Sequence, residues 1–235
     1  MGAARLKAKV FVAMPAFGGI VQAQTTSSLV ALTRELTDAG IFGGFSTLSF
    51  PCIEDLRNVF LSVWFDALDA THLLFIDADM SWEPSLIFDM LKADKELIGA
   101  IYPAKRLPIS FVGSPLEPPA EPEGNLLEVE GLGCGVMLIR RDAIQRIIDA
   151  GEATVTTDLR GTALAGLLEP HGVKRLIRAF DKLVTPDGRN LSEDFSYCFR
   201  HRAAAGKVWA WINARVTHLG TFAFSANYAD LYRAK

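Results

Sequence analysis

The sequence predicts an α/β protein with a mainly parallel central sheet flanked by helices. Short apolar runs alternate with helical patterns along the first half of the chain, as they do in successive β-α-β units. Two of these runs, residues 10–14 and 72–76, are almost continuously apolar, which is typical of strands buried on both faces of a sheet. A chain of 235 residues suffices for one such domain with a substantial core. We therefore expect a single Rossmann-like domain over residues 1–235.

In the first half of the chain, helices are expected between the strands. Residues 29–36 indicate the first helix because their leucines share one face, and Gly40 is suited to end it. Residues 53–68 repeat apolar side chains at steps of three and four and predict the second helix. Pro84 opens the third, since proline is tolerated at a first helical position. The strands are expected at residues 10–14, 44–50, 72–76 and 97–101.

The second half is less regular, and a small antiparallel part is expected there. Residues 103–124 are rich in Pro, Glu and Ser and predict a long surface loop. Residues 151–187 have no clean period and predict an irregular insertion with a helix around residues 173–180. The remaining expected elements are strands at residues 133–139 and 208–212 and near Val216, and helices at residues 144–148 and from Ser192.

The composition favours a globular protein of the cytoplasm. The formal net charge is −3, which shows no strong basic footprint for a nucleic acid or an anionic membrane. Three scattered cysteines without a C-x-x-C pair indicate reduced thiols and argue against a zinc site. The apolar run near the N-terminus meets Pro15 after a few residues, so it predicts neither a signal peptide nor a membrane span. We expect at most peripheral contact with a membrane.

The turn Asp77-Ala78-Asp79 is the strongest candidate for chemistry. It directly follows the expected buried strand at residues 72–76, and open α/β sheets bind ligands at the carboxyl ends of their strands. Residues two apart in an extended chain point to the same side, so the two carboxylates can converge. Their hard oxygen donors suit Mn²⁺ or Mg²⁺. The alternative is an Asx turn or a cap of the next helix.

Glu193 and Asp194 form a second acidic pair, at the expected start of a helix after Ser192. One carboxylate could reach a cleft and act as a general base. Acidic residues are also favoured in a first helical turn by the helix dipole alone, without a catalytic role.

Weaker signals lie in three other places. His218 could be a third metal ligand beside carboxylates, or a hydrogen-bonded core residue. Arg57 and Asn58 could line a nucleotide pocket or lie on the surface. The glycines of residues 131–135 permit close approach of a ligand, or form a turn and a tightly packed strand.

The order of these motifs resembles that of GT-A glycosyltransferases, especially their family 2-like inverting branch, over nearly the whole chain. The matching landmarks are residues 10–19 for the nucleotide-binding start, Arg57-Asn58 for the Arg-Asn pair, Asp77-Ala78-Asp79 for the D-x-D motif, residues 131–135 for the glycine-rich segment, Glu193-Asp194 for the x-E-D motif, and His218 for the C-terminal metal-binding histidine. The loop at residues 15–19 lacks the acidic or hydroxyl-rich cluster that usually contacts the base. Residues 151–187 have no counterpart, which leaves the acceptor side unassigned.

The resemblance implies a role for each matching residue. Residues 1–102 would bind the nucleotide sugar, and residues 103–235 the acceptor. Asp194 would be the general base, with Glu193 as the fallback. The metal ligands would be Asp77, Asp79 and His218. The donor contacts would be Pro15, Ala16, Arg57, Asn58, Asp77, Ala78, Asp79 and Lys105. Lys105 and its neighbour Arg106 would contact either the diphosphate or the acceptor.

The implied activity is a metal-dependent transfer, with Mn²⁺ or Mg²⁺, of a sugar from a nucleoside-diphosphate sugar to an acceptor hydroxyl with inversion. The acceptor would be a glycan, a lipid, a protein or a modified nucleobase. One alternative is a haloacid-dehalogenase-like phosphatase, because residues 77–81 superficially fit its D-x-D-x-[TS] loop. Its nucleophile strand normally comes near the domain start, whereas here two strands precede it. Another alternative is a non-catalytic module that binds a nucleotide sugar without turnover.

Overall fold

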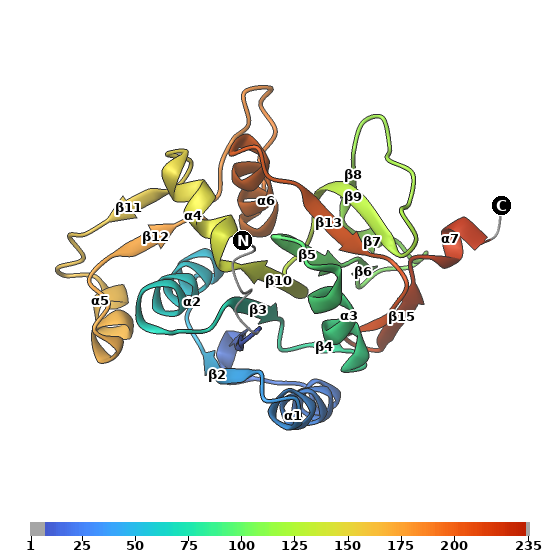
Figure 1. Cartoon of the computed structure of the whole chain (residues 1–235), viewed down its shortest axis with the longest axis horizontal. Coiled ribbons are helices and arrows are strands. Elements are labelled where there is room, and N and C mark those ends of the chain that lie inside the picture. The colour runs from blue at the N-terminus through green and yellow to red at the C-terminus, as the bar shows by residue number, and fades with distance from the viewer. Residues whose placement is uncertain (1–7, 234–235) are drawn as a thin grey trace, which may run out of the picture.

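The computed structural model describes residues 8–233, which form one large sheet covered by helices on both faces (Figure 1). Residues 1–7 and 234–235 of the expected domain lie outside this described part. The strands of the large sheet are β1 (Val10–Pro15), β2 (Phe42–Leu48), β3 (His72–Ile76), β5 (Leu97–Ala100), β8 (Ser114–Pro115), β9 (Leu126–Gly131), β10 (Val136–Arg140) and β13 (Val208–Trp211). They follow the spatial order β2-β1-β3-β10-β5-β13-β9-β8.

The sheet is mainly parallel, as expected. Strand β1 pairs in parallel with β2 and β3, and β13 pairs in parallel with β5. Strand β10 runs antiparallel between β3 and β5, with Val136 opposite Ile76. Because of this reversal, the chain that enters β10 lies at the carboxyl end of β3. The glycine-rich segment is thereby placed beside the D-x-D turn.

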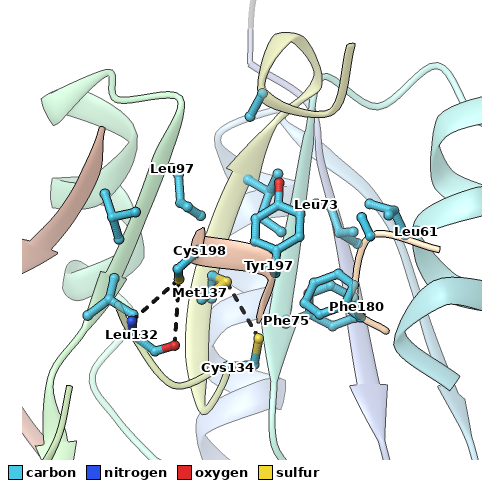
Figure 2. Packing of buried hydrophobic residues seen from close by; sticks show 14 of the residues in the cluster. Leu61, Leu73, Phe75, Leu97, Leu132, Cys134, Met137, Phe180, Tyr197 and Cys198 are labelled. Carbon is cyan, nitrogen blue, oxygen red and sulfur yellow. Dashed lines mark hydrogen bonds between the residues drawn. The ribbon is translucent and has the colours of Figure 1, made fainter. Parts of the chain in front are cut away.

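Two layers of helices bury the two faces of the sheet. Helices α1 (Ala23–Asp38) and α3 (Ser85–Ala93) cover one face. Helices α2 (Ile53–Ala67), α4 (Arg141–Asp149) and α6 (Glu193–Ala203) cover the other. Side chains alternate between the faces along each strand. Phe75 of β3 therefore contacts Phe180 on the α6 side (Figure 2), while its neighbour Leu74 packs on the α1 side.

Small antiparallel sheets complete the fold, as expected for the second half. They are β4 (Met80–Ser81) with β14 (Arg215–Leu219) and β15 (Ala223–Asn227), β6 (Tyr102–Pro103) with β7 (Phe111–Val112), and β11 (Thr154–Thr156) with β12 (Leu176–Arg178). The remaining elements are η1 (Phe17–Gly19), α5 (Ala163–Leu168), η2 (Glu169–His171) and α7 (Asp230–Arg233). Strand β14 pairs with β4 so that His218 lies opposite Met80, one residue after Asp79.

Two expectations for the second half were wrong. Residues 103–124 are no simple loop, because part of β6 and all of β7 and β8 lie there, and the unexpected strand β9 follows. The helix expected around residues 173–180 is replaced by β12, and the helix of this insertion is α5 (Figure 1). Leu176 and Ile177 are both fully buried, but in two different apolar clusters. Both residues pair with β11, Leu176 opposite Thr156 and Ile177 opposite Val155, and a strand turns such successive side chains to opposite faces.

None of the helices within residues 8–233 combines the length and the apolar character that a membrane crossing needs.

Candidate active site

A pocket of about 400 Å³ opens at the carboxyl edge of the sheet. Its walls come from the ends of β1 and β3, from α2, from the start of α6 and from β14. The lining residues are Pro15, Phe17, Ile20, Gln22, Ile53, Arg57, Asp77, Ala78, Asp79, Glu193 and His218. The fold therefore brings together most of the residues that the motifs singled out, from positions more than two hundred residues apart in the chain.

The turn between Asp77 and Asp79 is held by backbone hydrogen bonds to three distant segments. Asp77 N–H donates to the Gly135 carbonyl at 3.1 Å, and Gln22 N–H donates to the Ala78 carbonyl at 2.9 Å. Leu219 N–H donates to the Asp79 carbonyl at 2.7 Å. The first loop, the glycine-rich segment and β14 are thus all attached to the same turn, which fixes the directions of its two carboxylates.

Arg57 joins the two acidic motifs. Its Nη2 donates to Asp77 Oδ1 at 2.8 Å, and its Nε approaches Glu193 Oε1 at 3.4 Å. The Arg57 side chain is only 3% exposed, and its guanidinium lies 5.3 Å from the centre of the Phe75 ring. A charge this deeply buried needs partners of opposite sign. Arg57 therefore positions Asp77 and Glu193 on one side of the pocket.

Asp79 faces a different pair of groups. Lys105 Nζ lies 2.5 Å from Asp79 Oδ2, and His218 Nε2 lies 3.6 Å from Asp79 Oδ1. Burial raises the pKa of Asp79, but the ring of His218 and the ammonium group of Lys105 outweigh this effect and leave the pKa below its ordinary value. Asp79 is therefore a carboxylate at neutral pH.

Asp79 and His218 have the chemistry and spacing to share a divalent cation. The Pro103 carbonyl lies 3.0 Å from His218 Nδ1. A proton held on Nδ1 by this carbonyl would leave Nε2 free to present its lone pair to a cation bound between the two side chains. Two neighbouring ligands of one octahedral cation lie about 3 Å apart when each metal–ligand distance is about 2.1 Å. The 3.6 Å between Asp79 Oδ1 and His218 Nε2 is close to this separation.

Asp77 pairs with Arg57 through Oδ1, so the geometry brings together two of the three predicted metal ligands. Among residues 8–233, no group of three His, Cys, Asp or Glu side chains is arranged to hold a metal ion. Two protein ligands nevertheless fit Mg²⁺ or Mn²⁺, because such cations often complete their coordination with phosphate oxygens and water.

The acidic pair begins α6 as expected, and its two members differ in environment. Glu193 lines the pocket and contacts Arg57. Asp194 accepts hydrogen bonds from the Ser192 hydroxyl and from Phe195 N–H, and it does not line the pocket. Burial and the adjacent charge of Glu193 raise the pKa of Asp194 above its ordinary value. A raised pKa makes a carboxylate a better proton acceptor when it ionises.

Tyr102 packs against His218 without lining the pocket, and the sequence analysis missed this supporting residue. It is 4% exposed, its ring lies edge-on to His218 with 5.4 Å between centroids, and its hydroxyl accepts from Gly135 N–H at 3.2 Å. Burial and the charges of Asp77 and Asp194 raise its pKa well above the ordinary value, so its hydroxyl stays protonated. An isolated tyrosine at the end of an apolar strand carries no motif that could have identified it.

The glycine-rich segment makes room for this tyrosine. A methyl group on Gly133 would lie 2.2 Å from Tyr102 Oη, and one on Gly135 would lie 2.6 Å from the Tyr102 ring. A methyl group on Gly131 would lie 2.6 Å from the Phe195 ring. Of the two explanations that the sequence left open, the structure supports tight packing.

The sequence analysis also missed several residues of the pocket wall. Phe17 and Ile20 line the mouth of the pocket and are 79% and 67% exposed. Exposed apolar side chains of this size are informative when they border a pocket. Gln22 and Ile53 complete the wall. The loop at residues 15–19 was recognised, but an exposed aromatic side chain in a loop has no local signal that distinguishes it from a buried one.

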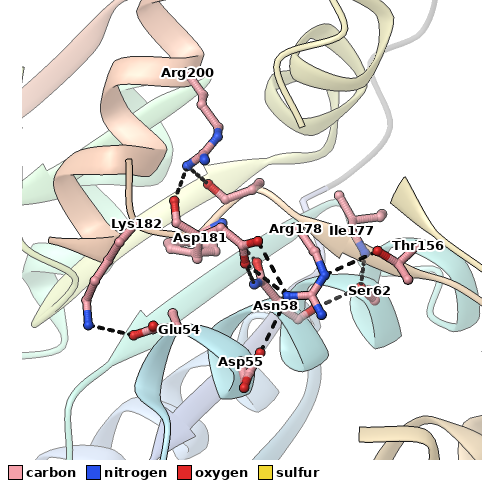
Figure 3. Close-up of polar contacts among 12 residues, drawn as sticks. Glu54, Asp55, Asn58, Ser62, Thr156, Ile177, Arg178, Asp181, Lys182 and Arg200 are labelled. Carbon is pink, nitrogen blue, oxygen red and sulfur yellow. Dashed lines mark hydrogen bonds and ion pairs between the residues drawn. The ribbon is translucent and has the colours of Figure 1, made fainter. Parts of the chain in front are cut away.

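Asn58 was expected in the donor pocket, and the structure corrects this. Its Nδ2 donates to Asp181 Oδ1 at 2.7 Å, and its Oδ1 accepts from Phe180 N–H at 2.8 Å (Figure 3). The side chain is fully buried and connects α2 to the chain after β12. Successive helical residues point about 100° apart, so Asn58 turns away from the pocket that Arg57 faces.

Two other expected donor contacts lie just outside the pocket lining. Ala16 is 3% exposed, and its N–H donates to the Leu48 carbonyl at 2.9 Å, while the preceding Pro15 lines the pocket. Lys105 reaches the site from the loop after β6 through its ion pair with Asp79.

Comparisons with known proteins bear on the fold. No protein-family model matches the sequence, and no curated protein is significantly similar to it. The crystal structure of A197 from STIV is similar with a TM-score of 0.53 at 17% identity, over 90% of this chain and 86% of that chain. The crystal structure of GalNAc-T7 with UDP, GalNAc and Mn²⁺ is similar with a TM-score of 0.50 at 9% identity, over 93% of this chain. This chain spans only 45% of that protein. At such identities the likeness shows architecture, and the fold is GT-A-like, as expected.

Proposed function

We propose that the chain is a metal-dependent glycosyltransferase that moves a sugar from a nucleoside-diphosphate sugar to an acceptor hydroxyl. The convergence of Arg57, Asp77, Asp79, Glu193 and His218 on one pocket at the carboxyl edge of a GT-A-like fold carries this proposal. The pocket lies in the size range of small-molecule sites. The crystal structure of GalNAc-T7, which has a similar fold, contains UDP, GalNAc and Mn²⁺ and supports the proposed class of donor.

The donor would bind between the loop at residues 15–20 and the D-x-D turn. Phe17 and Ile20 offer apolar surface to the base. Asp79 and His218 would hold the cation, and Asp77 would contact the cation or the ribose. When bound, Mn²⁺ or Mg²⁺ supplies positive charge that offsets the charge developing on the leaving diphosphate. Lys105, beside Asp79, would contact the diphosphate directly.

Asp194 would be the general base. The acceptor oxygen attacks the anomeric carbon, its proton passes to Asp194, and the bond from that carbon to the diphosphate breaks. An in-line attack of this kind inverts the anomeric configuration. The raised pKa of Asp194 supports the assignment. Asp194 does not line the donor pocket, so the acceptor hydroxyl would have to reach it from outside that pocket. Glu193 lines the pocket, contacts Arg57 and is the fallback. The acceptor hydroxyl would belong to a glycan, a lipid, a protein or a modified nucleobase.

The phosphatase alternative fits the site less well. It needs Asp77 as a nucleophile that attacks phosphorus, whereas Asp77 Oδ1 lies 2.8 Å from Arg57 Nη2 in a largely buried ion pair. A non-catalytic binding module would share the donor site and differ only in turnover. Donor binding without transfer to any acceptor would therefore favour the binding module.

The test is a thermal-shift panel of nucleotide sugars with and without Mn²⁺. A ligand at about a hundred times its dissociation constant should add roughly 2.7 kcal/mol of stability, which raises the melting temperature of a protein of this size by roughly 5–10 °C. Asp79→Ala and His218→Ala should each abolish the Mn²⁺-dependent part of the shift. Asp158→Ala, which removes an aspartate paired with Arg160 on the surface, is the matched control. A shift that is independent of Mn²⁺, or unchanged in both site variants, would refute the metal assignment.

A further inference from the structure

We infer that Lys105 makes metal binding at Asp79 depend on the donor diphosphate. In this arrangement the ammonium group of Lys105 and a divalent cation compete for the Asp79 carboxylate. The negative charge of a bound diphosphate would relieve this competition, because Lys105 can then pair with the diphosphate. The inference rests on the proposed function and adds to it a coupling between two ligands of the same site.

The two oxygens of Asp79 face two different groups. Oδ2 lies 2.5 Å from Lys105 Nζ, and Oδ1 lies 3.6 Å from His218 Nε2. A cation held by Oδ1 and Nε2 would therefore share its carboxylate with the ammonium group. Like charges at such short range repel each other, and a divalent cation doubles the effect of a monovalent one. Lys105 should consequently weaken metal binding when no other negative charge is present.

A diphosphate changes this balance because it brings negative charge to the same place. The Lys105 side chain has the properties needed to move toward it. Its side chain is 36% exposed, and its charge is carried on a flexible four-carbon stem. The stem passes beside Gly220, where a methyl group would lie 3.2 Å from Lys105 Cδ. The turn between β14 and β15 thus borders the stem, while the ammonium group remains at the exposed end.

The same short segment also orients the other ligand. The Pro103 carbonyl lies 3.0 Å from His218 Nδ1, and Lys105 follows two residues later. A movement of the chain after β6 would therefore affect both Lys105, which competes with the metal, and His218, which would bind it. Because linkage is reciprocal, a diphosphate that tightens metal binding must itself bind more tightly when the metal is present.

The decisive experiment titrates Mn²⁺ alone into the 235-residue chain and follows free Mn²⁺ by electron paramagnetic resonance. Lys105→Met keeps most of the stem and removes the charge, so the Mn²⁺ dissociation constant should fall about three- to tenfold. Lys105→Arg keeps the charge and should bind Mn²⁺ as weakly as the unmodified protein. Lys92→Met is the matched control, because Lys92 is an exposed lysine of α3 that pairs with Asp89 instead of Asp79, and it should leave Mn²⁺ binding unchanged.

A second titration adds the nucleoside diphosphate that stabilises the protein most in the thermal-shift panel. The factor by which it tightens Mn²⁺ binding should be smaller in Lys105→Met than in the unmodified protein, and its own affinity in saturating Mn²⁺ should fall. A purely structural role for Lys105 would weaken the binding of both ligands. A role as a diphosphate contact alone would leave Mn²⁺ binding unchanged. Either result would overturn the inference.

The failure of this inference is distinguishable from the failure of the proposed function. If the unmodified protein binds Mn²⁺ and the diphosphate together but Lys105→Met does not tighten Mn²⁺ binding, only the coupling role is refuted. If the unmodified protein binds neither ligand, the metal site and the coupling role are both refuted.

Discussion

The glycines that surround Tyr102 allow a sharp test of how the site is packed. A methyl group added at Gly133 would lie 2.2 Å from Tyr102 Oη and 2.7 Å from Val112 Cγ1. One added at Gly135 would lie 2.6 Å from both Cε1 and Cζ of the Tyr102 ring. Real methyl carbons do not approach other heavy atoms so closely. Gly133→Ala and Gly135→Ala should therefore displace Tyr102, which lies against His218.

The expected cost follows from these contacts. Overpacking of a core typically costs about 1–3 kcal/mol, and two clashing groups place Gly133→Ala at the upper end. For a protein of this size each kcal/mol lowers the melting temperature by about 2–4 °C, so we expect a loss of roughly 4–12 °C. Tyr102→Phe removes the closest atom and should partly rescue Gly133→Ala. It should not rescue Gly135→Ala, because the clashing ring carbons remain.

The measurement is a thermal melt of each single and double variant beside its transfer activity. Gly166→Ala is the control, because this glycine of α5 has no heavy atom within 4 Å of the added methyl group. Alanine is the better helix former, so this control should be neutral or slightly stabilising. If Gly133→Ala melts normally but loses transfer, the glycine faces a ligand and the packing argument is wrong.

Two further predictions concern acidic and basic groups of α6. Asp194→Asn should lower the transfer rate roughly 10²–10⁴-fold with donor affinity nearly unchanged, and Glu193→Gln should have a milder effect. NMR of the product should show an inverted anomeric configuration. A retained configuration, or full turnover by Asp194→Asn, would refute the assignment of Asp194 as the base. Burial lowers the pKa of His201 from 6.5 to about 4, so the unfolded state binds more protons between these values. The contribution of neutral His201 to the free energy of unfolding should be complete above about pH 6.5. It should decrease by about 3 kcal/mol as the pH drops to about 4. Urea unfolding at several pH values measures how the free energy of unfolding depends on pH, and this dependence should be weaker in His201→Leu. If it is unchanged in that variant, the acid sensitivity belongs to other groups.

Local patterns in the sequence were sufficient to predict the elements that carry the site. Continuous apolar runs predicted β1 and β3, and the repeat over residues 53–68 predicted α2. Ser192 was correctly expected to begin α6, because a hydroxyl residue followed by acids is a common helix start. Since the carboxyl ends of parallel strands share one edge, the position of Asp77 to Asp79 in the pocket also followed from the sequence.

Other features depended on residues far apart in the chain. Val173, Leu176, Ile177 and Phe180 have a spacing that suits a helix, but residues 176–178 pair with β11 and form the strand β12. A short apolar segment is compatible with both a helix and a strand, so the segments that pack against it decide which one forms. The antiparallel insertion of β10 between β3 and β5 likewise has no local signal.

The sequence alone determined the chemical types of the site: carboxylates after a buried strand, acids at a helix start and a late histidine. Only the tertiary structure decided how they pair. Arg57 bridges Asp77 to Glu193, and Lys105 shares Asp79 with His218. The physical reason is that secondary structure follows from short-range periodicity, whereas the packing of distant segments decides which side chain a charged group meets. Asp79 and His218, for example, are 139 residues apart in the sequence.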